Sequence, residues 1–294
     1  MLEWVLVAIS AYAFLSLVDL TSKVLRTRYI YSSTGMTALL LMGQAIPVLL
    51  IPFVDIWSLG LTHSVFALFA GALTAVPYWL FSKSLKREEV SRVSALWQTI
   101  PIFVLILAFV FLGERLPQLF YLSFVFLILG SLLISAKELS NIFKPDSVFW
   151  MMISASLIWA SQLVFLKSLY TSSGFMEIFL IMCLGRLLTA SVILILPSHR
   201  HLFKDLAAAN KWLIVLFVLA NSIGVFLYHY ALAIGSVTMV EALSGFQAFF
   251  TLFSAVAISK LAPTVLHEGT EVKVLALKFA AITLMFIGLI LVYL

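Results

Sequence analysis

Long apolar runs dominate this chain, and short breaks that are polar or contain proline or glycine separate them. Ten runs are recognisable, and each approaches or exceeds the roughly 20 mostly apolar residues that a helix needs to cross a hydrocarbon core about 30 Å thick. They cover residues 4–25, 30–52, 63–83, 91–112, 117–136, 147–168, 175–197, 212–234, 238–260 and 272–293. The pattern predicts an all-α membrane protein with ten transmembrane helices.

The composition favours a membrane protein and excludes a separate soluble domain. Of the 294 residues, 63% are hydrophobic and 11% are charged, and the mean hydropathy is +1.15, whereas a soluble chain carries about 25% charged residues. The longest connections, 137–146, 198–210 and 261–271, are too short to fold alone. Any functional group is therefore expected within the helices or between them.

The charge distribution, the cysteine content and the N-terminal sequence argue against a nucleic-acid partner, a disulfide framework and a cleaved signal peptide. The net charge is +5, but the basic residues are dispersed through many loops, so nucleic acid is not an expected partner. The single cysteine, Cys183, lies in an apolar run and excludes a disulfide framework within one chain. No basic stretch or cleavage site accompanies the first apolar run, which is expected to be retained as a helix.

The chain contains an internal repeat. The segment that begins YWLFSKSLK at Tyr78 aligns without gaps to the segment that begins VFLYHYALA at Val225, an offset of 147 residues. Upstream, Lys23 matches Lys167, and the pair 43–44 (Gly-Gln) matches the pair 185–186 (Gly-Arg). The repeat predicts two five-helix halves, residues 1–140 and 141–294. Because five is odd, the second half is expected to be inverted in the membrane.

Lysine and arginine are distributed unevenly between the two sides of the predicted helices. The side that follows the first, third, fifth, seventh and ninth helices carries fourteen of them, and the opposite side carries only Arg115 and Lys167. The positive-inside rule alone places the fourteen in the cytoplasm and both chain ends outside.

Three short stretches resemble a known transporter signature. Residues 84–87 (SLKR), 94–96 (SAL) and 111–116 (FLGERL) are similar to the helix 3 and helix 4 signature of the EamA-type members of the drug/metabolite transporter superfamily. The resemblance implies ten helices in two repeats, and transport or export of amino acids, metabolites or drugs. It also implies cytoplasmic termini, contrary to the charge count, so the sequence leaves the orientation open.

Several family features can be placed residue by residue. The lysine late in helices 1 and 6 corresponds to Lys23 and Lys167, and the arginine of helix 7 to Arg186, whereas the first half has Gln44 at the equivalent position. The second half departs from the family pattern at residues 259–261 (SKL), which replace the turn LGERL. The resemblance implies a multi-pass protein of the cell membrane.

Ionisable residues at membrane depth are functional candidates, because they are expensive to bury. Glu241 is a candidate for binding a substrate amine or accepting a proton, or alternatively a carboxylate favoured by the N-terminal end of its helix. Asp19 is a second proton-coupling candidate, four residues before Lys23, with which it can pair on the helix surface. Arg186 could hold a substrate carboxylate or phosphate, or could brace the bundle by pairing with Glu177, Glu241 or backbone carbonyls.

Aromatic and amide side chains form a second group of candidate substrate ligands, because an apolar pocket with a few polar groups suits a small amphipathic solute. They are Tyr78, Trp97, Gln98, Trp159, Gln162 and Tyr228, and each could instead serve packing or an interfacial belt. Pro77 and Pro101 predict kinks in the third and fourth helices, while their counterparts Gly224 and Ala248 predict straighter or more closely packed helices.

The sequence carries no sign of ATP hydrolysis or of a catalytic centre. It lacks a G-x-x-x-x-G-K-[ST] loop and an H-E-x-x-H motif, so we expect no cofactor, no metal, no catalytic residue and no enzymatic activity. We expect a secondary carrier, monomeric in the bilayer, that exports amino acids or related small metabolites by alternating access around a central cavity. The alternatives are a carrier or flippase for a phosphate-containing or lipid-linked sugar, and a non-transporting membrane subunit or intramembrane enzyme.

Overall fold

The structure is a computed structural model that describes residues 3–30, 32–88, 90–135, 143, 145–196, 210–261 and 272–293. All regular secondary structure within these ranges is helical. The predicted connections 137–146, 198–210 and 261–271 lie largely outside the described residues. The expected all-α fold is therefore confirmed for the part of the chain that the structure describes.

The helices follow the predicted apolar runs, although several runs are divided into shorter helices. The undivided helices are α1 (Glu3–Arg28), α8 (Gln118–Ser135), α9 (Ser147–Ser172), α10 (Phe175–Ile195), α12 (Lys211–Ile234) and α15 (Val272–Tyr293). The divided runs give α2 (Ser33–Met42) and α3 (Ala45–Val48), α4 (Leu61–Leu73) and α5 (Ala75–Ser84), α6 (Val90–Trp97) and α7 (Ile100–Leu107), and α13 (Val237–Ala242) and α14 (Gly245–Leu261). Short helical turns cover Ile51–Phe53, Ile56–Leu59 and Ala108–Leu112.

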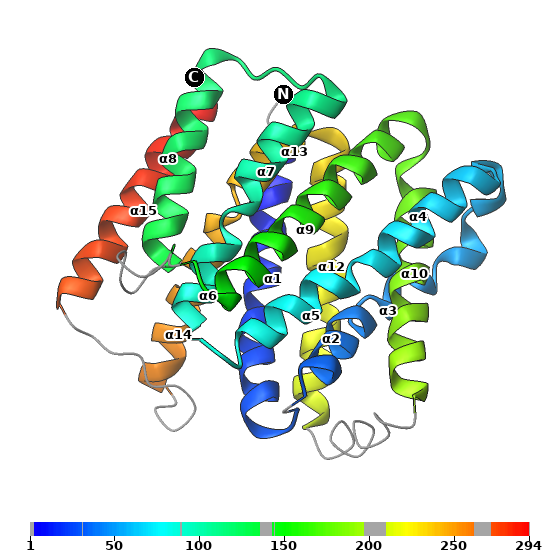
Figure 1. Cartoon of the computed structure of the whole chain (residues 1–294), viewed down its shortest axis with the longest axis horizontal. Coiled ribbons are helices and arrows are strands. Elements are labelled where there is room, and N and C mark those ends of the chain that lie inside the picture. The colour runs from blue at the N-terminus through cyan, green and yellow to red at the C-terminus, as the bar shows by residue number, and fades with distance from the viewer. Residues whose placement is uncertain are drawn as a thin grey trace.

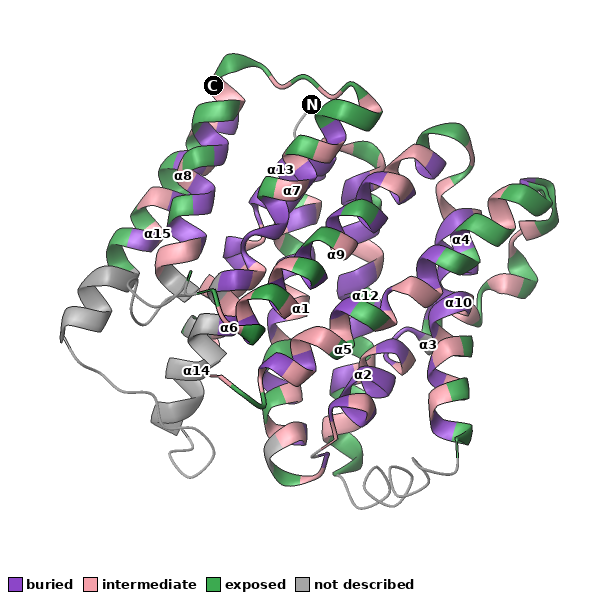
Figure 2. Ribbon diagram, in the orientation of Figure 1, coloured by how far each residue is buried: buried purple, intermediate pink, exposed green. Residues whose placement is uncertain are grey.

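Six helical segments among the described residues are long and apolar enough to cross a membrane. They are Glu3–Arg26, Ser33–Phe53, Leu61–Ser84, Ser147–Ser172, Phe175–Ile195 and Lys211–Ile234, and shorter apolar helices cover Ile100–Leu112, Gln118–Leu133 and Phe279–Val292. Large apolar side chains such as Phe69 and Val192 are exposed on these helices, as suits contact with lipid (Figure 2). The chain is an integral, multi-pass membrane protein.

Proline accounts for two of the helix breaks. Proline has no N–H, so Pro77 cannot bond to the carbonyl of Leu73 or Pro101 to that of Trp97. Leu73 is the last residue of α4 and Trp97 is the last residue of α6, so the predicted kinks are present. The counterpart of α4 and α5 in the sequence repeat, α12, is unbroken. The break between α13 and α14 contains no proline, and the N–H groups of Ser244, Phe246 and Gln247 bond there to carbonyls three residues earlier instead of four.

The helices pack as a bundle in which segments distant in the sequence lie side by side. α8 packs along α15, α1 along α12, and α4 along α10. The last pair approaches closely because of two glycines: a Cβ on Gly71 would lie 2.0 Å from the Met182 carbonyl oxygen, and one on Gly185 would lie 2.2 Å from that of Leu68. α1 begins and α15 ends at the same end of the bundle (Figure 1).

Candidate functional site

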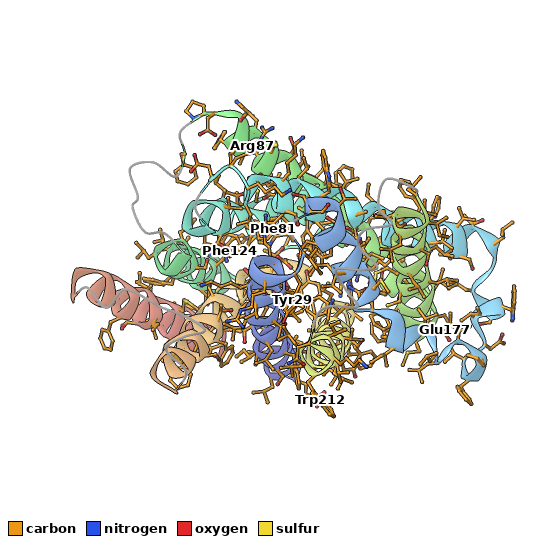
Figure 3. All side chains as sticks on the ribbon, turned by 90° about the horizontal axis from the view of Figure 1, so that it is seen from below. Tyr29, Phe81, Arg87, Phe124, Glu177 and Trp212 are labelled. Atoms are coloured by element: carbon orange, nitrogen blue, oxygen red, sulfur yellow. The ribbon has the colours of Figure 1, made fainter. Side chains whose placement is uncertain are left out.

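Aromatic side chains from three helices form a cluster inside the bundle. The Trp159 ring on α9 lies 5.4 Å from that of Tyr78 on α5 and 5.8 Å from that of Trp97 on α6, between centroids. Trp97 in turn lies 5.0 Å from Phe81, which Figure 3 places in the interior when the bundle is viewed from below, whereas Trp212 lies at the rim. All four clustered rings are half-buried. Three predicted ligands, Tyr78, Trp97 and Trp159, are thus brought together.

Glu241 adjoins this cluster through Tyr228. The Glu241 side chain on α13 is buried, with 4% exposed, and its carboxylate accepts a hydrogen bond from the Tyr228 hydroxyl on α12. The Trp159 indole lies near the same hydroxyl. Tyr12 of α1 packs edge-on against Tyr228, at 6.1 Å between centroids, and donates to the Val240 carbonyl at 2.8 Å. The buried acid and the aromatic cluster therefore form one continuous site.

Two further predicted residues lie where helices from the two halves meet. Gln98 occupies the break between α6 and α7, and its Oε1 accepts a hydrogen bond from Ser244 Oγ, at 3.0 Å, in the break between α13 and α14. The Asp19 carboxylate on α1 accepts from Gln247 Nε2 at 2.8 Å and from Thr251 Oγ1 at 3.2 Å, both on α14. The Asp19 side chain is exposed. Because a lipid-facing carboxylate is unfavourable, Asp19 is best explained by a water-accessible surface.

Arg186 lies in a network of neutral partners. Its side chain on α10 is 1% exposed. Nε donates to Thr74 Oγ1 at 3.1 Å, Nη1 donates to the Gln44 side-chain oxygen, and Nη2 donates to His229 Nε2 at 3.3 Å. These partners replace the acids and backbone carbonyls that the sequence suggested. Gln44 is also the residue that the repeat alignment pairs with Arg186.

The same network includes Gln162, which was expected beside the aromatic residues. Gln162 Nε2 donates to Thr74 Oγ1 at 2.6 Å and to a backbone carbonyl of α4 at 2.7 Å. Since a guanidinium can only donate, His229 Nε2 accepts from Arg186, and its protonated Nδ1 faces the Tyr170 hydroxyl at 3.1 Å. The network thus fixes a neutral His229 tautomer and joins helices from both halves.

The end of the bundle that holds the chain termini is closed by two polar contacts. Glu114, in the turn LGERL, accepts a hydrogen bond from the Thr238 hydroxyl at 2.6 Å, at the start of α13. Lys167 Nζ donates to three carbonyls at the C-terminal end of α12, those of Leu232, Ala233 and Gly235, at 2.8–2.9 Å. A cavity of about 230 Å³ adjoins these two side chains, lined also by Leu112 and Thr171. Lys167 therefore caps a helix rather than remaining free for a ligand.

A second cavity, of about 330 Å³, lies between the beginning of α2 and the end of α5. None of the predicted substrate ligands lines either of these two cavities. Tyr78, Trp97 and Trp159 instead contact one another.

Comparison with known proteins decides the family. Residues 2–136 match the EamA-like transporter family. This match assigns residues 2–136, somewhat less than half of the chain, to the EamA-type transporters. One solved structure, described only as a "Crystal structure of protein", superposes with a TM-score of 0.70 at 14% identity and covers 98% of this chain and 94% of that one. At this identity it supports the fold alone. No curated protein matches the sequence.

The EamA-type transporter also contains site residues that sequence reasoning did not select. His229, Thr74 and Tyr170 take part in the Arg186 network, and Tyr12 packs beside Glu241. A signal existed for His229, because an ionisable residue inside a predicted transmembrane run is a functional candidate. Thr74, Tyr170 and Tyr12 carry no such signal, since isolated hydroxyl groups are common in membrane helices.

Proposed function

We propose that this EamA-type transporter is a secondary active exporter of small amine-bearing metabolites, with amino acids as the first class to test. The observation that carries the proposal is the continuous set of Tyr78, Trp97 and Trp159 with Tyr228 and Glu241. Aromatic faces attract a cationic group, and a buried carboxylate neutralises it. We assign substrate binding to these five residues and to Gln98, at the junction of the two halves.

The proposed architecture is ten transmembrane helices in two inverted five-helix repeats, residues 1–140 and 141–294. α1 begins and α15 ends at the same end of the bundle (Figure 1), which supports an even number of membrane crossings. The repeat is supported by the hydrogen bond between Gln44 and Arg186, because residues related by a two-fold axis can meet where they lie close to that axis. Alternating access would then occur between the halves, in a monomer of the cell membrane.

Two observations favour an amine over the phosphate-containing or lipid-linked sugar of the alternative function. That alternative relied on Arg186 and Lys167 to hold phosphate. All three guanidinium nitrogens of Arg186 donate to neutral protein acceptors, and Lys167 donates to three backbone carbonyls. We therefore assign Arg186 to bracing α10 against its neighbours. Gln162 shares that role through its amide nitrogen.

We propose that a proton gradient drives transport through Glu241, with Asp19 as a second carrier of protons. Glu241 is buried and, among the described residues, has no cationic partner. It can therefore carry either a proton or a substrate amine, and exchange between the two would couple their movements. Asp19 is exposed and accepts hydrogen bonds from neutral groups of α14, and its exposure suits the entry or release of protons.

Counterflow in proteoliposomes tests the proposal. Liposomes preloaded with unlabelled amino acids, cationic amines or nucleotide sugars are exposed to the labelled compound, with and without a pH gradient. We expect exchange of an amine-bearing class, an increase when a pH gradient is imposed, and loss of at least about tenfold in Glu241→Gln, equivalent to about 1.4 kcal/mol. The matched control is Glu177→Gln, the same chemical change in the first turn of α10, which should transport normally.

The variants separate the two roles of Glu241. If Glu241→Gln still exchanges substrate but no longer responds to the pH gradient, the carboxylate carries protons and does not bind substrate. An unaltered response to the gradient would remove the proton role. Exchange of nucleotide sugars alone would refute the amine assignment, and no exchange by folded protein would favour the non-transporting alternative.

A further inference from the structure

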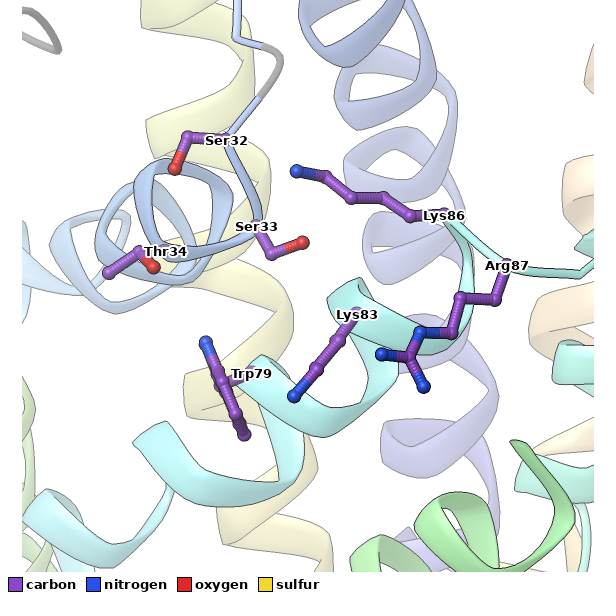
Figure 4. A pocket seen from close by; sticks show the side chains of 7 residues that line it. All are labelled: Ser32, Ser33, Thr34, Trp79, Lys83, Lys86 and Arg87. Atoms are coloured by element: carbon purple, nitrogen blue, oxygen red, sulfur yellow. The ribbon is translucent and has the colours of Figure 1, made fainter. Parts of the chain in front are cut away.

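A basic pocket lies at the end of the bundle opposite the chain termini and shares no lining residue with the proposed substrate site. It is the cavity of about 330 Å³ between the beginning of α2 and the end of α5. Its lining consists of three hydroxyl-bearing residues, one tryptophan and three cations: Ser32, Ser33, Thr34, Trp79, Lys83, Lys86 and Arg87. Figure 4 shows these side chains arranged around a shared space. Among the residues that the structure describes, no acidic one lines this cavity.

The three cations and the hydroxyls of Ser32 and Thr34 can donate hydrogen bonds to a phosphate oxygen, whereas the Ser33 hydroxyl donates to the Ser82 carbonyl at 3.1 Å. Ser32 caps α2, and its hydroxyl accepts from the Gly35 N–H at 3.3 Å, so the first turn of the helix opens at the cavity. The first N–H groups of a helix have no partner within the helix, and its dipole favours an anion at that end. Lys83 Nζ lies 4.4 Å from the centroid of the Trp79 ring, which holds this ammonium in place beside the hydroxyls.

The fold does not require these charges. In the gap-free repeat alignment, Lys83, Lys86 and Arg87 correspond to residues 230, 233 and 234, which are tyrosine, alanine and isoleucine. Cations at the end of α5 also suit its helix dipole, but a single one would be enough for that purpose. Three cations converging on one cavity without a lining acid repel each other, and a bound anion relieves this repulsion.

We propose that this pocket binds a phosphate group, supplied either by an anionic phospholipid headgroup or by a small soluble phosphate. The exposed positions of Lys86 and Arg87 leave the site open to the membrane surface. Trp79 is 37% exposed, and tryptophan is enriched at the level of lipid headgroups. The phosphate is a ligand distinct from the transported substrate, and its binding is measured without any transport.

Native mass spectrometry of the full chain in detergent tests the proposal, with phosphatidylglycerol as the probe and phosphatidylcholine as the neutral comparison. The test variant is Lys83→Gln with Arg87→Gln. The matched control is Arg28→Gln with Lys211→Gln, which removes the same charge from two exposed residues outside the pocket. We expect phosphatidylglycerol to bind the test variant at least about tenfold more weakly than wild type, and the control to bind as wild type.

A competition experiment distinguishes the two sources of phosphate. Displacement of phosphatidylglycerol by millimolar inorganic phosphate identifies a site for soluble phosphates, and resistance to displacement identifies a lipid headgroup site. Equal weakening in the test and control variants would overturn the proposal in favour of overall charge, as would equal binding of both lipids or no binding of phosphatidylglycerol. If the double variant does not fold, Lys86→Gln alone should still weaken binding, since this side chain is exposed.

Discussion

Replacing Arg186 by lysine tests whether this residue braces the bundle through the shape of its guanidinium or merely through its charge. The three acceptors, Gln44, Thr74 and His229, come from three different helical segments. A planar guanidinium donates to all three at once, whereas a lysine ammonium is a compact point charge on a different stem. The substitution keeps the positive charge and removes the planar guanidinium group with its several N–H donors.

The magnitude follows from the hydrogen bonds that are lost. We expect lysine to retain one of the three bonds, and each lost bond to a charged donor contributes about 1.5–3 kcal/mol. Arg186→Lys should therefore destabilise the fold by about 3 kcal/mol or more. For a chain of this size such a loss lowers Tm by roughly 6–12 °C.

The single cysteine provides the assay. Cys183 is fully buried, and its Sγ lies 3.9 Å from the Gln44 oxygen that accepts from Arg186. A fluorogenic dye that reacts with thiols therefore labels the protein when this part of the bundle opens, and a thermal ramp in detergent gives Tm. The control is Arg115→Lys, the same change at an exposed position, for which we expect a change below about 0.5 kcal/mol. A wild-type Tm for Arg186→Lys would refute the idea that the guanidinium group braces the bundle.

Two further predictions concern helix contacts and use the same thiol assay. Gly185→Ala places a methyl group against the Leu68 carbonyl, which cannot rotate away, so α4 and α10 must separate at a cost of about 1–3 kcal/mol. The control Leu188→Ala, on the exposed side of α10, should change stability by less. Equal losses of stability in the two variants would contradict the close approach of the helices. In a double-mutant cycle of Glu114→Ala with Thr238→Val, we expect a coupling energy of about 1 kcal/mol because one hydrogen bond joins the two side chains. Strictly additive losses of stability would show that this contact does not close the bundle.

Local features of the fold could be predicted from the sequence because they depend on local chemistry. The apolar runs predicted where helices lie, and Pro77 and Pro101 predicted two of the breaks, since a missing N–H acts within its own helix. The break at Ser244 carries no such mark. Its Ser244 side chain bonds to Gln98 of another helix, and a contact between residues 146 positions apart has no signature in a single sequence.

The candidate site likewise has features that could be predicted from the sequence and features that could not. The polar and aromatic types of Glu241, Tyr228 and Trp159 selected them individually, because such residues are unusual at membrane depth. Their assembly into one site depends on how α9, α12 and α13 pack, which the sequence does not specify. Arg186 shows the limit most clearly. Its burial was foreseen, but neutral partners in place of acids follow only from the meeting of the two halves.

The hydrogen bond between Ser244 and Gln98 has a mechanical consequence. Helices bend most easily where their own hydrogen bonds are interrupted, so the breaks after α6 and after α13 are the natural hinges of this bundle. The side chains that occupy the two breaks are bonded to each other at 3.0 Å. Flexing one hinge therefore pulls on the other, and the two halves are expected to change shape in a single concerted step rather than independently.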